Sequence, residues 1–189
     1  MVQDSQHKKD LLVQIREAYG RVLYTYTSHL KIMNRFVKQN KIIKYTQIVL
    51  SAVSTGGFIG AIFSNEIILT VIGGFFSTLL LAINLFCKDF NLSNEIKQHQ
   101  IASDDLWLIR EEYISLLTDF CALSEVEIIC KRDDLQKRTY ELYKKSPKTD
   151  AKSYSEAQKA LKYEEEQFFT KEELDKMLPE HLRNKSNQQ

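Results

Sequence analysis

The sequence predicts an all-α membrane protein: a two-helix transmembrane hairpin with long flanking cytoplasmic helices that form an antiparallel stalk, followed by short C-terminal helices. Two uncharged runs of 21 residues each, residues 45–65 and 67–87, are separated only by Glu66. Apolar residues recur at helical spacing before and after these runs. No segment alternates apolar and polar residues as a half-buried strand does. The predicted regions are residues 1–44, 45–88, 89–145 and 146–189.

Each uncharged run is long enough to cross a bilayer. About 20 helical residues rising about 1.5 Å each span the roughly 30 Å hydrocarbon layer. We therefore predict transmembrane helices at about residues 45–64 and 67–87, joined by a tight turn. The alternative is a buried hairpin in a soluble protein, because hydroxyl and amide residues make the first run only moderately apolar. That alternative requires a large surrounding core, whereas the rest of the chain is strongly polar.

The segment before the membrane is predicted to be an amphipathic cytoplasmic helix. Its apolar residues follow alternating steps of three and four, the heptad pattern of a coiled coil. No proline precedes Pro147, so we expect this helix to enter the first membrane span without a break. The cytoplasmic seam consists of Leu12, Ile15, Tyr19, Val22, Tyr26, His29, Met33 and Phe36.

Basic residues at the ends of the two runs predict the topology. Five basic residues, with no acid among them, lead into the first run, and Lys88 follows the second. Because such residues stay on the cytoplasmic side, both termini are predicted to be cytoplasmic. The same residues suit contact with the anionic head groups of the lipid bilayer, and nucleic acid is not expected as a partner. The basic approach consists of Lys31, Arg35, Lys38, Lys41 and Lys44.

Residues 89–145 are predicted to fold back along the first helix. They carry a second apolar stripe, reinforced by Trp107, and both helices leave the membrane on the same face. Pairing them buries two stripes at little cost in loop closure. We expect a break near Ser124 and then a polar helix at about Glu125–Lys145. The second stripe contains Ile96, His99, Leu106, Tyr113, Leu117 and Phe120.

Two capping boxes predict short helices in the C-terminal tail. In this motif a residue at the helix start and a second one three positions later satisfy each other's backbone amides. Ser153 with Glu156 predicts a helix that runs to about Phe168. Thr170 with Glu173 predicts a short last helix.

Small residues in the two runs are candidates for transmembrane helix packing, because small faces let helix backbones approach closely. The contacts could lie inside one hairpin or between the hairpins of several subunits, and the sequence fits both. The candidates are Gly56, Gly57, Gly60, Ala61, Gly73, Gly74, Thr78 and Ala82.

Polar residues in the same runs are candidates for lining a pore. The alternative is that their hydroxyls bond backbone carbonyls one turn back. Asn84 differs, because a carboxamide cannot satisfy all of its hydrogen-bonding groups in that way and tends to seek another helix. The pore-lining candidates are Ser51, Ser54, Thr55, Ser77 and Asn84.

Motifs of known enzyme classes are missing from the sequence. There is no HExxH, Walker loop, GxSxG or dinucleotide fingerprint, so we predict no catalytic, cofactor-binding or metal-binding residues and no enzyme activity. The cysteines are odd in number and form no CxxC pair, which favours packing over a disulfide framework or a nucleophile. They are Cys87, Cys121 and Cys130.

The segment after the membrane resembles a known family. The letters LWLIREEYISLLTD at residues 106–119 and FTKEELDKMLPEHLR at residues 169–183 are similar to those of the SLATT family of bacterial two-helix membrane effectors. Such effectors accompany synthases of nucleotide second messengers. The resemblance extends from about Leu11 to Arg183, although the membrane part matches more in architecture than in letters.

The resemblance implies a role in anti-phage defence by abortive infection, at the bacterial inner membrane. A nucleotide signal made on infection would open or assemble a channel, with a cyclic-oligonucleotide synthase or a nucleotide cyclase as partner. Our leading hypothesis is a homo-oligomeric pore whose hairpins associate through their small-residue faces. The second hypothesis is a membrane-tethered helical adaptor that holds a partner enzyme at the bilayer.

Overall fold

The computed structural model describes residues 2–64 and 66–183, and these residues contain helices but no strand. Of the described residues 86% are helical, which confirms the predicted all-α class. Part of the predicted tail, residues 184–189, lies outside the described residues. The helices are α1 (Val2–Ser64), α2 (Ile67–Asp89), α3 (Leu92–Asp119), α4 (Glu125–Lys145), α5 (Ala151–Lys162), α6 (Lys171–Met177) and the short 3-10 helix η1 (Glu180–Leu182).

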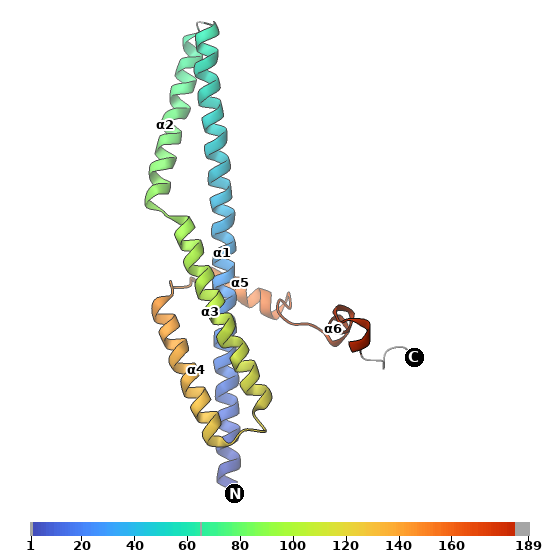
Figure 1. Ribbon diagram of the computed structural model, residues 1–189. Helices are drawn as coiled ribbons and strands as arrows, with labels where there is room; N and C mark the ends of the chain where they lie inside the picture. Colours follow the sequence, from blue (N-terminus) through green and yellow to red (C-terminus); the bar gives the residue numbers. More distant parts are fainter. Residues whose placement is uncertain (1, 65, 184–189) are drawn as a thin grey trace.

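Helix α1 is one unbroken helix that forms part of both the stalk and the hairpin. Its 63 residues extend over about 95 Å and reach almost from one end of the molecule to the other (Figure 1). The predicted entry into the membrane span without a break is therefore confirmed. A rigid element of this length connects the stalk directly to the turn at the far end of the hairpin.

The partner of α1 is divided into two helices. Helix α2 runs beside the hairpin half of α1 and α3 beside the stalk half, with a bend between them (Figure 1). The bend follows from capping: the Phe90 N–H closes α2 on the Phe86 carbonyl, and the Asn91 side chain accepts the Asn94 N–H to start α3. A straight helix thus faces a bent antiparallel partner.

The core of the stalk lies between α1, α3 and α4. Ile15 and Val22 of the predicted seam are fully buried, and Leu106 and Tyr113 pack with them from α3. Trp107 does not belong to this core, because its side chain is 49% exposed. The core residues are Leu11, Ile15, Ala18, Val22, Leu106, Ile109, Tyr113, Leu116, Phe120, Ile128 and Leu135.

Two of the four histidines of the chain form a buried pair across the stalk. The Nδ1 atoms of His29 on α1 and His99 on α3 are 2.8 Å apart, so one neutral ring donates a hydrogen bond to the other. Burial, and then the neighbouring His99, lowers the pKa of His29 to about 4. Burial also lowers the pKa of His99, although Glu95 and Asp150 partly oppose this effect.

The histidine pair makes the stalk sensitive to acid. The folded state holds these protons more weakly than the unfolded state, in which the histidine pKa is near 6.5. The contribution of the pair to stability is therefore fully present above about pH 6.5 and is lost as the pH falls toward 4. We expect the melting temperature to drop by at least about 5 °C between pH 7 and pH 4.5. The paired substitutions His29→Gln and His99→Gln should flatten this dependence. An unchanged pH profile in that double variant would contradict the assignment.

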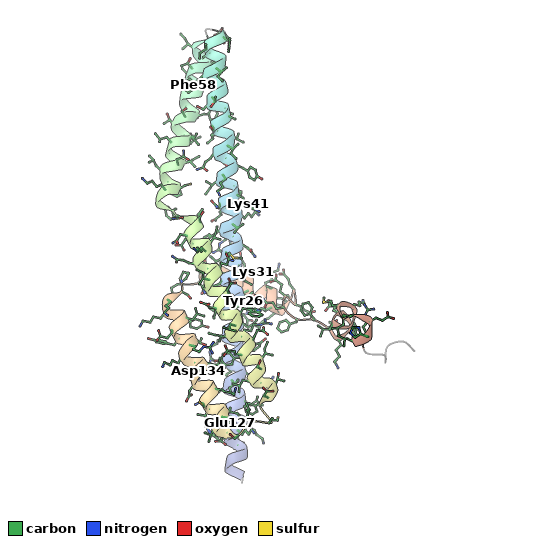
Figure 2. The ribbon with its side chains drawn as sticks, viewed as in Figure 1. Tyr26, Lys31, Lys41, Phe58, Glu127 and Asp134 are labelled. Atoms are coloured by element: carbon green, nitrogen blue, oxygen red, sulfur yellow. The ribbon has the colours of Figure 1, made fainter. Side chains whose placement is uncertain are left out.

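Helix α5 lies across α1, just below the membrane half of the molecule. Arg35 forms ion pairs with Asp150 and, at 3.6 Å, with Glu156. Lys31, which lies on α1 near α5 in Figure 2, pairs with Glu166 at 2.6 Å. The first two residues of the basic approach, Lys31 and Arg35, are therefore neutralised by the C-terminal tail.

The boundaries of α5 correct one prediction. The capping box is formed by Asp150 and Ser153, not by Ser153 and Glu156, because the Asp150 carboxylate accepts the Ser153 N–H at 2.6 Å. The helix also ends at Lys162, well before Phe168. Positive φ angles at Glu165 and Gln167, of 50° and 73°, are incompatible with a continuing helix.

The other predicted boundaries in the C-terminal half are confirmed. Helix α4 covers Glu125–Lys145 behind a capping box of Ser124 with Glu127. Helix α6 starts at the predicted box of Thr170 with Glu173. In Figure 1, α6 stands to the side of the bundle.

Candidate functional site in the transmembrane hairpin

The hairpin helices touch most closely at two glycines. A Cβ atom added to Gly57 would lie 3.1 Å from the Cα of Gly73, and one added to Gly73 would lie 3.2 Å from the Ser54 carbonyl oxygen. Nearer the turn, a Cβ on Gly60 would lie 3.2 Å from the Leu69 side chain. Backbone therefore packs directly on backbone at this crossing, which only residues without a side chain permit.

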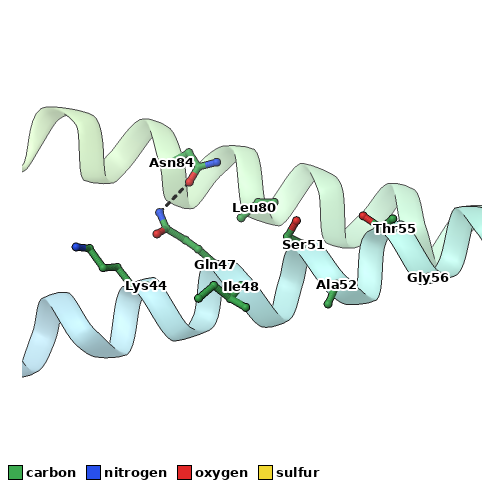
Figure 3. Close-up of a pocket in the computed structure, with 9 residues that line it drawn as sticks. All are labelled: Lys44, Gln47, Ile48, Ser51, Ala52, Thr55, Gly56, Leu80 and Asn84. Carbon is green, nitrogen blue, oxygen red and sulfur yellow. Dashed lines mark hydrogen bonds between the residues drawn. The ribbon is translucent and has the colours of Figure 1, made fainter.

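Hydrogen bonds join the two helices at two places along the hairpin. Ser54 donates to the Gly73 carbonyl at 3.1 Å and lies 2.5 Å from the Ser77 hydroxyl. Nearer the stalk, the Gln47 amide donates to the Asn84 side-chain oxygen at 2.8 Å (Figure 3). These bonds satisfy groups that would otherwise face hydrocarbon, so they favour pairing of α1 and α2 inside one chain.

The heptad pattern of the stalk continues into the hairpin half of α1. Beyond Phe36, the same steps of three and four reach residues that are buried or half-buried, whereas most of their neighbours are exposed. The predicted contact residues did not include Gln47 and Leu50, although extending the heptad pattern by two repeats beyond Phe36 identifies both. The continued positions are Asn40, Ile43, Gln47, Leu50, Ser54, Gly57 and Ala61.

The predicted packing and pore-lining residues are mixed between two faces. Ser54 and Ser77, predicted to line a pore, lie at the contact between α1 and α2 with Gly57, Gly60 and Gly73. The half-buried Ala61 follows the same face of α1. A Cβ on Gly56 or Gly74 would meet no atom within 4 Å. The exposed candidates are Ser51, Thr55, Gly56, Thr78, Ala82 and Asn84, and Gly74 is half-buried.

An open groove of about 760 Å³ follows the exposed side of the hairpin (Figure 3). Its α1 wall presents Gln47, Ser51 and Thr55 one turn apart, interspersed with small residues, and Lys44 lies at the end nearer the stalk. The α2 wall contributes Leu80 and Asn84. The surface of the groove is mostly apolar, but a row of polar side chains on its α1 wall lies on a face that the membrane half of the chain leaves uncovered.

Two hydroxyls in the groove lack hydrogen-bond partners. The hydroxyls of Thr46 and Thr78 each donate to the backbone carbonyl one turn back, at 3.0 Å, which is the alternative to pore lining given above. Ser51 and Thr55 make no such bond within the described part of the chain. Their hydroxyls remain available to water or to another helix.

Exposure of the two apolar segments argues against a soluble hairpin. In the most apolar 18-residue window of each helix, only 17% and 6% of the residues are buried. The core helix of a soluble protein would be mostly buried. Two helices are thus long and apolar enough to cross a membrane and present most of their side chains outward. Among the described residues, no group of three or more His, Cys, Asp or Glu side chains could hold a metal ion.

Comparison with known families shows what the chain resembles over most of its length. The model of the family described as "SMODS and SLOG-associating 2TM effector domain family 4" matches residues 11–173. The match covers most of α1, all of α2 to α5 and the first turn of α6. Neither the curated proteins nor the solved structures include a protein that matches this chain.

Proposed function

Because the chain belongs to the SMODS and SLOG-associating 2TM effector domain family, we propose that it is a non-enzymatic effector of bacterial anti-phage defence. In this proposal it lies in the inner membrane with both termini in the cytoplasm. On a nucleotide signal from a partner synthase, several copies assemble and their hairpins form a pore. Loss of the membrane barrier then stops growth of the infected cell.

The groove on the exposed side of the hairpin carries this proposal. In hydrocarbon, the free hydroxyls of Ser51 and Thr55 would each cost about 1–3 kcal/mol of unmet hydrogen bonding. A second hairpin or a column of water would remove that cost. Gly56 beside them leaves room for another backbone to approach. Hairpins associated side by side along this groove would surround a space lined by hydroxyl and amide groups.

The unbroken α1 helix supports signal transmission in the same proposal. The cytoplasmic bundle and the groove lie on one rigid element, so a shift of the bundle relative to its neighbours moves the groove as well. A signal bound in the cytoplasm thus has a direct mechanical route to the membrane half.

Substitution at Gly56 tests the proposal, because it changes the groove without changing the hairpin. The Gly56→Leu variant should keep the melting temperature of the single chain, since an added Cβ meets no atom within 4 Å. We expect release of a trapped dye from liposomes, in the presence of the activating synthase product, to fall at least about tenfold. Val49→Leu, on an exposed lipid-facing position, is the matched control. Full dye release by Gly56→Leu would contradict a pore built along the groove.

A membrane-tethered adaptor is the second candidate. Three large apolar residues on the cytoplasmic part of α3, Ile101, Trp107 and Leu108, are about half exposed and could receive a partner enzyme. Exchanging the hairpin for an unrelated membrane anchor separates the two candidates. An adaptor should keep protecting infected cells after the exchange, whereas a pore should lose all protection.

A further inference from the structure

A second pocket, of about 660 Å³, lies where the bent α2–α3 chain faces the straight α1 helix. Ile42 and Ile43 of α1 and Phe86 and Phe90 at the end of α2 form its apolar part. Its polar part includes Gln39 of α1 and Glu95 of α3. The position of the pocket follows from the fold, because a straight helix cannot stay in contact with a partner that bends.

Local contacts on the α2–α3 side keep the pocket open. The rings of Phe86 and Phe90 stack with centroids 4.9 Å apart, and the Phe90 N–H bonds the Phe86 carbonyl. The side-chain oxygen of Asn91 is used to cap α3. These groups interact with one another within the α2–α3 segment, so the rest of the described chain leaves the apolar wall of the pocket uncovered.

The polarity of the pocket changes along the membrane normal. Ile43 lies 23 residues before Glu66 and Phe86 lies 20 residues after it, so both are about 30–35 Å from the turn, at the inner edge of the hydrocarbon layer. Gln39 lies one turn farther, at the depth of the head groups. Ile43 and Phe86 therefore face the bilayer, whereas Gln39 and Glu95 lie toward the cytoplasm, where Phe36 and Leu92 add apolar surface beside them. Apolar groups at the hydrocarbon edge with polar groups beyond them suit a phospholipid of the inner leaflet.

We propose that this pocket binds one phospholipid with a primary ammonium head group, such as phosphatidylethanolamine. Its acyl chain lies against Ile43, Phe86 and Phe90, and its ammonium group pairs with Glu95. Apolar walls of this extent disfavour water. The Ile42, Phe86 and Phe90 side chains are exposed, so the acyl chains of the bilayer are the apolar groups next to them. Glu95 is the one charged residue that lines the pocket, so charge complementarity selects a cationic head. Lipid binding here does not depend on pore formation.

Native mass spectrometry of the full chain tests this site. The protein would be purified from nanodiscs containing equal amounts of phosphatidylethanolamine and phosphatidylglycerol. We expect one retained lipid, with the ethanolamine lipid enriched about fivefold over its share in the nanodisc. Ile43→Trp, which fills the apolar part, should lose the retained lipid, whereas Ile59→Trp on the exposed mid-membrane face should not. Glu95→Gln should retain a lipid without the head-group preference.

Two results would overturn the proposal: equal lipid retention by Ile43→Trp and wild type, or no ethanolamine preference in wild type. A second measurement covers the possibility that Ile43→Trp disturbs the fold. Phe90→Trp in a Trp107→Phe background places a single tryptophan at the pocket wall, because Trp107 is the sole tryptophan of the chain. Quenching by brominated ethanolamine lipid should persist after dilution into unbrominated lipid. Immediate recovery of fluorescence would show bulk lipid only.

Discussion

Replacing Gly73 with leucine should separate the two hairpin helices, whereas the same change at the next residue, Gly74, should leave them paired. An added Cβ at Gly73 would lie 3.2 Å from the Ser54 carbonyl oxygen and 3.3 Å from the Phe58 backbone nitrogen. Neither atom can move aside as a flexible side chain does. Overpacking of a core typically costs about 1–3 kcal/mol, and contact with backbone on both sides of a helix crossing places this variant at or above the upper end.

The same substitution also breaks two polar contacts. Ser54 bonds both the Gly73 carbonyl and the Ser77 hydroxyl, so pushing the helices apart leaves these groups unmet in hydrocarbon. Cross-linking between cysteines introduced on facing positions of α1 and α2 would measure the separation, with thermal unfolding in detergent as a second readout. Similar losses in Gly73→Leu and Gly74→Leu would show that the crossing is not where the structure places it.

The α1 residues that contact α2 could largely have been predicted from the sequence. Gly56 with Gly60 and Gly57 with Ala61 are both small-residue pairs at a spacing of four, and this motif alone does not choose between them. Continuing the heptad of the stalk past Phe36 does choose, because it reaches Gly57 and bypasses Gly56.

The tail shows what local sequence could not decide. Asp150 and Ser153 both qualify as helix caps, and local chemistry ranks them about equally. Asp150 also pairs with Arg35, which is 115 residues away in the chain. That tertiary contact accompanies the earlier helix start, and no local pattern encodes it. Trp107 illustrates the same limit, because helical spacing placed it beside the core while packing of α3 on both α1 and α4 left it outside.

Truncating Tyr113 to alanine should be the most damaging single change in the helical bundle of the stalk. Its side chain is 1% exposed and packs in the core that α1, α3 and α4 share. Removing a buried aromatic ring costs about 3–5 kcal/mol, through lost apolar burial and the cavity that remains. A domain of ordinary stability, about 5–15 kcal/mol, would lose a large part of its folding free energy.

Tyr140 provides the matched control on the neighbouring helix. It is 62% exposed, so Tyr140→Ala should change stability by less than about 0.5 kcal/mol. Denaturant titration followed by the fluorescence of Trp107, the sole tryptophan, reports the bundle without a signal from the membrane helices. Because α1 continues from this core into the hairpin, Tyr113→Ala should also abolish signal-dependent dye release while the hairpin still inserts. Retained dye release from a variant whose bundle is unfolded would mean that the hairpin acts independently of the stalk. Neither the adaptor nor the pore hypothesis could then rely on a signal received by the bundle.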